Sequence, residues 1–202
     1  MRTLVIECAT EACSAALFQG GALVDGFCEV IGRGHAERLV PLIAELPDKG
    51  RAQRIVVSLG PGSFTGVRIG LATARALGLA WQADVLGYPT LALVAAMARV
   101  ERPGPVTVCM AGGHGEWFVQ DFAADGSPEG PHASLPPDRA AGFARQATVA
   151  GSQAAALVTL RGTGEALPLL PDAQFYPVLP DRLLTSSLAP LYGRPPDARL
   201  PA

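Results

Sequence analysis

The stretch Gly60-Pro-Gly-Ser-Phe-Thr-Gly-Val-Arg-Ile-Gly70 decides the fold, because it joins a strand-like run to a helix-like run. Residues 54–58 have the apolar, β-branched composition of a buried strand, and residues 67–81 have helical spacing. We therefore predict a strand–turn–helix unit. The free N–H groups and the positive dipole end at the start of such a helix favour an anion. Candidate anion or nucleotide contacts in this loop are Gly62, Ser63, Thr65 and Gly66.

The loop nevertheless lacks the standard motifs of phosphate binding and nucleophilic catalysis. It contains no lysine of a Walker loop, and its G-x-G-x-x-x-G spacing is one residue longer than a dinucleotide fingerprint. Ser63 has Pro61 and Thr65 where a nucleophile elbow needs glycines. Two interpretations stay open: a tight connector between strand and helix, and a loop that contacts phosphate.

The helix that follows carries a stripe of small residues. Every fourth position is small: Gly66, Gly70, Ala74 and Gly78. Glycine inside a helix costs about 1 kcal/mol relative to alanine, so the stripe indicates close contact with another element. The charged residues of this helix, Arg68 and Arg75, fall on one line. We expect its own sheet to cover one side, and either a helix of the same chain or a helix of a partner subunit to cover another.

Composition limits the classes of function. The chain has 202 residues, 49% of them hydrophobic, which suits one large domain or two lobes. Its net charge of −2 excludes the basic face of a stand-alone nucleic-acid binder. No apolar run has the roughly 18 residues of a membrane span, and Glu7 interrupts any signal-peptide core, so we expect no membrane association and a cytoplasmic location. The four cysteines form no C-x-x-C pair, so we expect buried free thiols.

Hydrophobic periodicity predicts an α/β protein with two lobes, residues 1–101 and a smaller lobe of residues 102–202. The first lobe should hold a three-stranded meander, a helix bent by Pro41, the glycine loop with its helix, a short strand and another helix. The expected ranges are 3–9, 14–19, 22–30, 34–46, 54–58, 67–81, 85–87 and 89–99.

The second lobe should begin with a hairpin of residues 106–110 and 116–122. A turn-rich, mobile stretch at 123–137 should follow, and then a helix at 139–146, a strand at 148–150 and a helix from residue 152. Prolines crowd the chain from Pro168 onward, so little regular structure is expected there.

The polar residues show no catalytic or metal constellation. Four residues after His35 stands Leu39, so a helical pair of metal ligands is missing. Glu7, at the end of the first strand, is the best single acid candidate, because strand ends in α/β lobes often face a cleft. We predict no catalytic residue and no metal site.

Several segments resemble one known family. They are Ile6-Glu-Cys-Ala-Thr-Glu-Ala-Cys-Ser14, residues 35–42, the glycine loop, and Gly87-Tyr-Pro-Thr-Leu91. Together they resemble the bacterial TsaB (YeaZ) family over roughly the first 100 residues, with weaker likeness at 115–117 and 190–194. The resemblance implies an actin-like, sugar-kinase-like (ASKHA) fold of two lobes with mixed sheets flanked by helices.

The resemblance also implies a function without catalysis. Family members pair with the catalytic subunit TsaD, the ATPase TsaE joins them, and the complex makes threonylcarbamoyladenosine beside the anticodon of tRNA. It implies a homodimer when the chain is alone, contact with tRNA only through the complex, and no tightly bound cofactor, with ATP or ADP at the junction between subunits. The expected partner interface comprises His35, Leu39, Leu42, Ile43, Gly70, Ala74 and Gly78.

The sequence departs from the family pattern at three positions. Glu7 stands where the family has Asp, and Ala111 and Gly113 stand where it has Asp and Arg. Two alternatives stay open: an active nucleotide-dependent phosphotransferase of the same fold, and a glycoprotease-like peptidase.

Overall fold

The first lobe is built on a mixed five-stranded sheet of order β3-β2-β1-β4-β5. The structure, a computed structural model, describes residues 1–193. Its first five strands are β1 (Arg2–Glu7), β2 (Ala12–Gln19), β3 (Ala22–Val30), β4 (Arg54–Ser58) and β5 (Asp84–Tyr88). β1, β2 and β3 form the predicted antiparallel meander, while β4 and β5 run parallel to β1. β1 and β2 are buried along nearly their whole length, as expected of strands covered on both faces.

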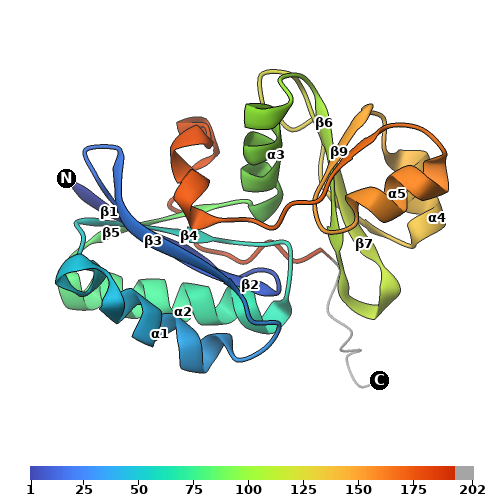
Figure 1. Cartoon of the computed structure of the whole chain (residues 1–202). Coiled ribbons are helices and arrows are strands. Elements are labelled where there is room, and N and C mark those ends of the chain that lie inside the picture. Colours follow the sequence, from blue (N-terminus) through green and yellow to red (C-terminus); the bar gives the residue numbers. More distant parts are fainter. Residues whose placement is uncertain (194–202) are drawn as a thin grey trace.

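Helices cover both faces of this sheet (Figure 1). α1 (His35–Glu45) and α2 (Phe64–Trp81) lie side by side on one face, and α3 (Thr90–Glu101) lies on the other. α2 begins three residues earlier than predicted, because Ser63 caps it: the Ser63 Oγ accepts a hydrogen bond from the Gly66 N–H at 3.2 Å.

The second lobe is also built on a mixed five-stranded sheet, of order β10-β9-β6-β7-β8. Its strands are β6 (Val106–Ala111), β7 (Trp117–Phe122), β8 (Ala133–Leu135), β9 (Thr148–Ala150) and β10 (Glu165–Leu167). α4 (Pro137–Phe143) and α5 (Ala154–Arg161) cover its outer face, while α3 lies between the two lobes (Figure 1). Residues 90–98 of α3 are all buried, and one apolar core runs from the first sheet through α3 to the second.

Several expectations for the second half need correction. Strands β8 and β10 were not predicted, because their residues, Ala-Ser-Leu and Glu-Ala-Leu, include none of the β-branched residues that mark the equally short β9. The turn-rich stretch is tied to β7 by a hydrogen bond from Gln120 Nε2 to the Gly130 carbonyl at 2.8 Å. In the proline-rich region up to residue 193 the expectation of little regular structure is confirmed: it holds only short 3-10 turns, at Ala173–Val178 and Asp181–Leu183.

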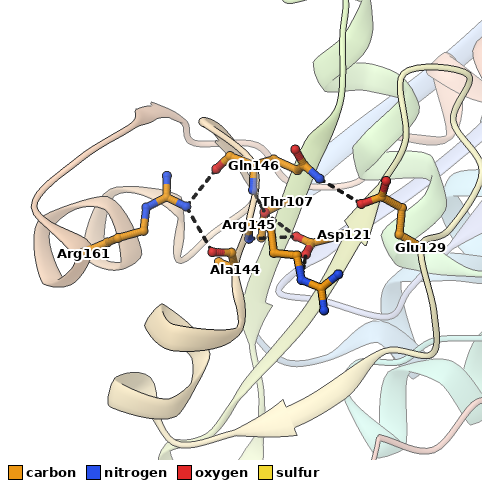
Figure 2. A network of polar contacts seen from close by, with 7 residues as sticks. All are labelled: Thr107, Asp121, Glu129, Ala144, Arg145, Gln146 and Arg161. Atoms are coloured by element: carbon orange, nitrogen blue, oxygen red, sulfur yellow. Dashed lines mark hydrogen bonds and ion pairs between the residues drawn. The ribbon is translucent and has the colours of Figure 1, made fainter.

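A polar network fastens the start of β9 to the second sheet (Figure 2). The Thr107 hydroxyl donates to the Asp121 carboxylate and accepts a hydrogen bond from the Gln146 N–H at 3.2 Å. Gln146 Nε2 donates to Glu129, and the Arg161 guanidinium donates to the Gln146 carbonyl, both at 2.8 Å. Thr107 and Asp121 are buried, so this network satisfies groups that would otherwise lack partners.

The segment before residue 194 returns to the first lobe. Thr185 pairs with Gly87 at the end of β5, and the Leu191 N–H donates to the Leu59 carbonyl at 2.7 Å. The Arg75 guanidinium donates to the Leu188 carbonyl at 3.0 Å. This return brings residues 188–193 across α2 and the glycine loop. Within residues 1–193, no helix combines the length and the apolar character that crossing a membrane requires.

Candidate functional site

A cavity of about 790 Å³ lies where the two lobes meet. Four segments supply most of its wall: the β1–β2 turn, the start of α2, the β6–β7 turn and the returning C-terminal segment. Their lining residues are 9–11, 62–64, 111–114 and 191–193, joined by Gly32, Val67, Arg68 and Phe118. The site is therefore built from loops that lie far apart in the sequence.

The glycine loop approaches the end of β1 at very short range. A Cβ on Gly62 would lie 2.0 Å from the Ala9 carbonyl oxygen, and a Cβ on Gly66 would lie 2.0 Å from the Cys8 carbonyl oxygen. These positions are glycine because no side-chain atom fits there. Of the four predicted anion contacts, Gly62 and Ser63 line the cavity, while Gly66 is buried and Thr65 is exposed outside the lining.

Arg68, one of the two charged residues of α2, lines the cavity. Its guanidinium lies 3.5 Å from the centroid of the Phe64 ring and donates to the Tyr192 hydroxyl at 2.9 Å. The position was unpredictable because Tyr192 is 124 residues away in the sequence. This stack of Phe64, Arg68 and Tyr192 ties α2 to the C-terminal segment.

Glu7 is fully buried and does not line the cavity. Its Oε1 accepts a hydrogen bond from the Ala9 N–H at 2.7 Å, and its Oε2 accepts one from the Tyr88 hydroxyl at 3.1 Å. Burial raises the pKa of Glu7 to about 7, although hydrogen bonds from Ala9, Ser58 and Tyr88 oppose the shift. Both carboxylate oxygens are thus engaged within the protein, and Glu7 holds the end of β1 to β5.

His35 and His114 belong to different elements. His35 is buried at the start of α1, with Nε2 at 3.3 Å from the Ala12 carbonyl oxygen. His114, in the β6–β7 turn, lines the cavity beside Ala111 and Gly113. No group of three or more metal-ligating side chains occurs among residues 1–193. Of the four cysteines, Cys28 is exposed, so the expectation that all are buried is wrong there.

The residues predicted for the partner interface are covered by their own chain. His35, Leu39, Leu42 and Ile43 are buried in the core beneath α1. A Cβ on Gly70 would meet Val57 of β4 at 3.5 Å, and one on Gly78 would meet Val85 of β5 at 2.5 Å. Ala74 is also fully buried. The small-residue stripe therefore packs on its own sheet, and its interpretation as a partner-facing surface is wrong.

The opposite side of the same two helices is exposed, and apolar residues alternate there with the charged side chains of Glu37, Glu45 and Arg75. Val40 is 53% exposed and Leu79 is 85% exposed. We define the α1–α2 face as the exposed residues Ala36, Val40, Ala44, Ala72, Ala76, Leu79 and Ala80. The members on α1 recur every fourth residue. On α2, Ala72, Ala76 and Leu79 are four and three residues apart, and Ala80 follows Leu79, so each set lies along one side of its helix.

Comparison with known proteins places these features in a family. The description "TsaD: tRNA N6-adenosine threonylcarbamoyltransferase" belongs to the family profile that matches residues 27–132, just over half of the chain. The "tRNA threonylcarbamoyladenosine biosynthesis protein TsaB" of Escherichia coli is 40% identical over 100 residues, covering 47% of this chain and 43% of that protein. The chain thus matches less than half the length of this curated relative.

Two solved structures from Pseudomonas aeruginosa extend the likeness. One is YeaZ, with a TM-score of 0.79 and 28% identity over 95% of this chain and 99% of its own. The other, an uncharacterised protein similar to peptidase YeaZ, has a TM-score of 0.74 and 30% identity over 86% of this chain and 87% of its own. The chain belongs to the TsaB/YeaZ family. The predicted actin-like, two-sheet fold is confirmed.

In this TsaB/YeaZ family member, two departures from the family pattern lie in the cavity wall. Ala111 and Gly113 supply small, uncharged groups at positions where an acid and an arginine are expected. Among the described residues, the charged side chains of the lining are Glu11 and Arg68, and His114 and Tyr192 are its other titratable groups.

Proposed function

We propose that this chain takes part in the biosynthesis of tRNA threonylcarbamoyladenosine as a non-catalytic subunit that pairs with TsaD. The role in this biosynthesis follows from membership of the TsaB/YeaZ family, since the Escherichia coli relative is named a tRNA threonylcarbamoyladenosine biosynthesis protein. The profile description of TsaD supports a partner related to this chain.

The observation that carries the proposal is the α1–α2 face. Val40, Ala76 and Leu79 are exposed at the surface of two helices that already pack together. Contiguous exposed apolar surface on a soluble domain is typical of protein–protein contacts. The complementary half would be a helix pair of TsaD, or a second copy of this chain when TsaD is missing.

Three features in and near the cavity support the absence of catalysis. Glu7 uses both carboxylate oxygens for hydrogen bonds inside the protein, and it does not line the cavity. The Arg68 guanidinium is stacked on Phe64 and hydrogen-bonded to Tyr192. The Ser63 hydroxyl oxygen caps α2. These three groups, which could otherwise act on a nucleotide or a nucleophile, each have a structural partner.

The proposal is tested by placing a charge on the α1–α2 face. Ala76→Glu and Val40→Glu add an unpaired carboxylate where a partner would exclude water, which costs several kcal/mol. We expect about tenfold or greater weakening of association with TsaD, and a matching loss of tRNA modification by the reconstituted proteins.

Leu160→Glu is the matched control. Leu160 on α5 is 56% exposed, close to the 53% of Val40, but it lies in the other lobe. It should pair with TsaD like the wild type. Normal pairing by folded Ala76→Glu and Val40→Glu proteins, judged by circular dichroism and sedimentation, would refute the proposed face. Modification that proceeds equally well without this chain would refute the proposed role.

A further inference from the structure

Cys8 and Cys13 bring two thiols together at the base of the β1–β2 turn. Their sulfur atoms lie 3.8 Å apart, and both residues are buried. Glu7 pairs with Ser14 in the β1–β2 register, so Cys8 and Cys13 occupy the next opposite positions. Opposite residues in antiparallel strands have Cα atoms about 4.5 or 5.5 Å apart, and a disulfide accepts both spacings.

We propose that Cys8 and Cys13 form a redox-active pair that a hydroperoxide converts into a cross-strand disulfide. The two sulfurs need to approach by less than 2 Å to reach a bond length of about 2.05 Å. The flanking turn, residues 9–12, already holds the two strand ends in place.

The surroundings shift the pKa values of the two thiols in opposite directions. A hydrogen bond from the Cys8 thiol lowers the pKa of Cys13, and the positive charge of Arg38 on α1 acts in the same direction. The same hydrogen bond, together with burial, raises the pKa of Cys8. Burial and the acidic groups Glu29 and Glu7 oppose the ionisation of Cys13, but the net direction of its pKa is down. Cys13 is therefore the attacking thiolate and Cys8 the resolving thiol.

The reaction proceeds in two balanced steps. The Cys13 thiolate attacks one oxygen of the hydroperoxide; an S–O bond forms, the O–O bond breaks, and hydroxide leaves and takes a proton to become water. Cys8 then attacks the Cys13 sulfur; the S–S bond forms, the S–O bond breaks, and the hydroxyl group leaves as water with the Cys8 proton. Two thiols are oxidised and one peroxide is reduced.

The disulfide would constrain the β1–β2 turn, which forms part of the cavity wall. The turn it closes contributes Ala9, Thr10 and Glu11 to the cavity lining. The Ala9 carbonyl accepts a hydrogen bond from the Ser63 N–H at 2.7 Å, so the turn also positions the start of α2. Oxidation of the pair should therefore change the contact between the glycine loop and the residues that follow β1.

The test is peptide mass spectrometry of the folded protein after exposure to hydrogen peroxide. Trypsin releases residues 3–33 as one peptide that holds Cys8, Cys13 and Cys28, so the experiment uses a Cys28→Ser background. We expect this peptide to become lighter by two hydrogen atoms and to lose both alkylation sites. Reduction with a dithiol should restore both.

Cys109 and a second variant provide the controls. Cys109 is buried without a thiol neighbour, and burial raises its pKa to about 12, so it should stay reduced at the same peroxide concentration. Adding Cys8→Ser should abolish the mass loss and leave Cys13 as sulfenic or sulfinic acid. The proposal is overturned if Cys8 and Cys13 stay reduced until Cys109 also reacts, or if Cys13 acquires oxygen while Cys8 remains free.

Discussion

Replacing Glu7 with glutamine should change how the stability of the protein depends on pH. Glu7 is fully buried, and its pKa in the folded protein is about 7, against 4.5 for an ordinary glutamate. Glutamine has nearly the same shape and carries no charge at any pH. Its amide oxygen can still accept the hydrogen bond from the Ala9 N–H that Oε1 accepts now.

The direction in which the stability changes with pH follows from the number of protons bound in each state. Between pH 4.5 and 7 the folded wild type keeps a proton that the unfolded chain has already lost, so its free energy of unfolding falls as pH rises. The difference between the two pKa values corresponds to roughly 3 kcal/mol, at about 1.4 kcal/mol per pH unit. This stability is fully present below about pH 4.5 and is lost above about pH 7. Glu7→Gln should therefore gain up to about 3 kcal/mol relative to the wild type between pH 5 and 8.

The assay is urea denaturation followed by circular dichroism from pH 5 to 8.5. The quantity to plot is the unfolding free energy of Glu7→Gln minus that of the wild type, since other ionisable groups then cancel. Glu29→Gln is the control: the hydrogen bond from Arg38 lowers the pKa of Glu29, so Glu29 is ionised in both states throughout this range and the corresponding difference should not change with pH. A flat difference for Glu7→Gln, or one that falls with pH, would mean that Glu7 is ionised inside the folded protein and that burial does not dominate its pKa.

The remaining predictions concern packing, polar satisfaction and nucleotide binding. Gly66→Ala should destabilise the fold by about 1 to 3 kcal/mol, because its Cβ would overlap the Cys8 carbonyl oxygen. Gly70→Ala, whose Cβ meets Val57 at an ordinary 3.5 Å, should stabilise the fold by up to about 1 kcal/mol; equal effects of the two changes in urea denaturation would contradict this account. Thr107→Val should cost about 1 to 3 kcal/mol, because it leaves the Gln146 N–H without a partner and the buried Asp121 carboxylate with only its longer contacts to Arg145; a neutral result would show that the network in Figure 2 contributes no stability. The isolated chain should bind ATP more weakly than micromolar, because Arg68 is already engaged by Phe64 and Tyr192; tight binding in calorimetry, or ATP turnover, would favour the phosphotransferase alternative.

The sequence by itself determined the local units of the first lobe. The meander, the strand at Arg54–Ser58, the glycine loop and the helix after it follow from periodicity and turn chemistry, which act between neighbours in the chain. The family also follows from the sequence, because its motifs lie in contiguous segments within the first 100 residues. In the second lobe, the hairpin was predictable from the same short-range signals, whereas β8 and β10 were not.

Only the tertiary structure decided which surface each residue faces. The small-residue stripe of α2 predicted close packing correctly, but a period of four positions does not say what lies opposite, and Gly70 and Gly78 pack on β4 and β5 of the same chain. Glu7 could have faced the cleft; instead its carboxyl group bonds to Tyr88, 81 residues later. Arg68 likewise contacts Tyr192, 124 residues later. Such contacts depend on how the lobes and the C-terminal segment pack together, and the spacing of neighbouring residues cannot predict them.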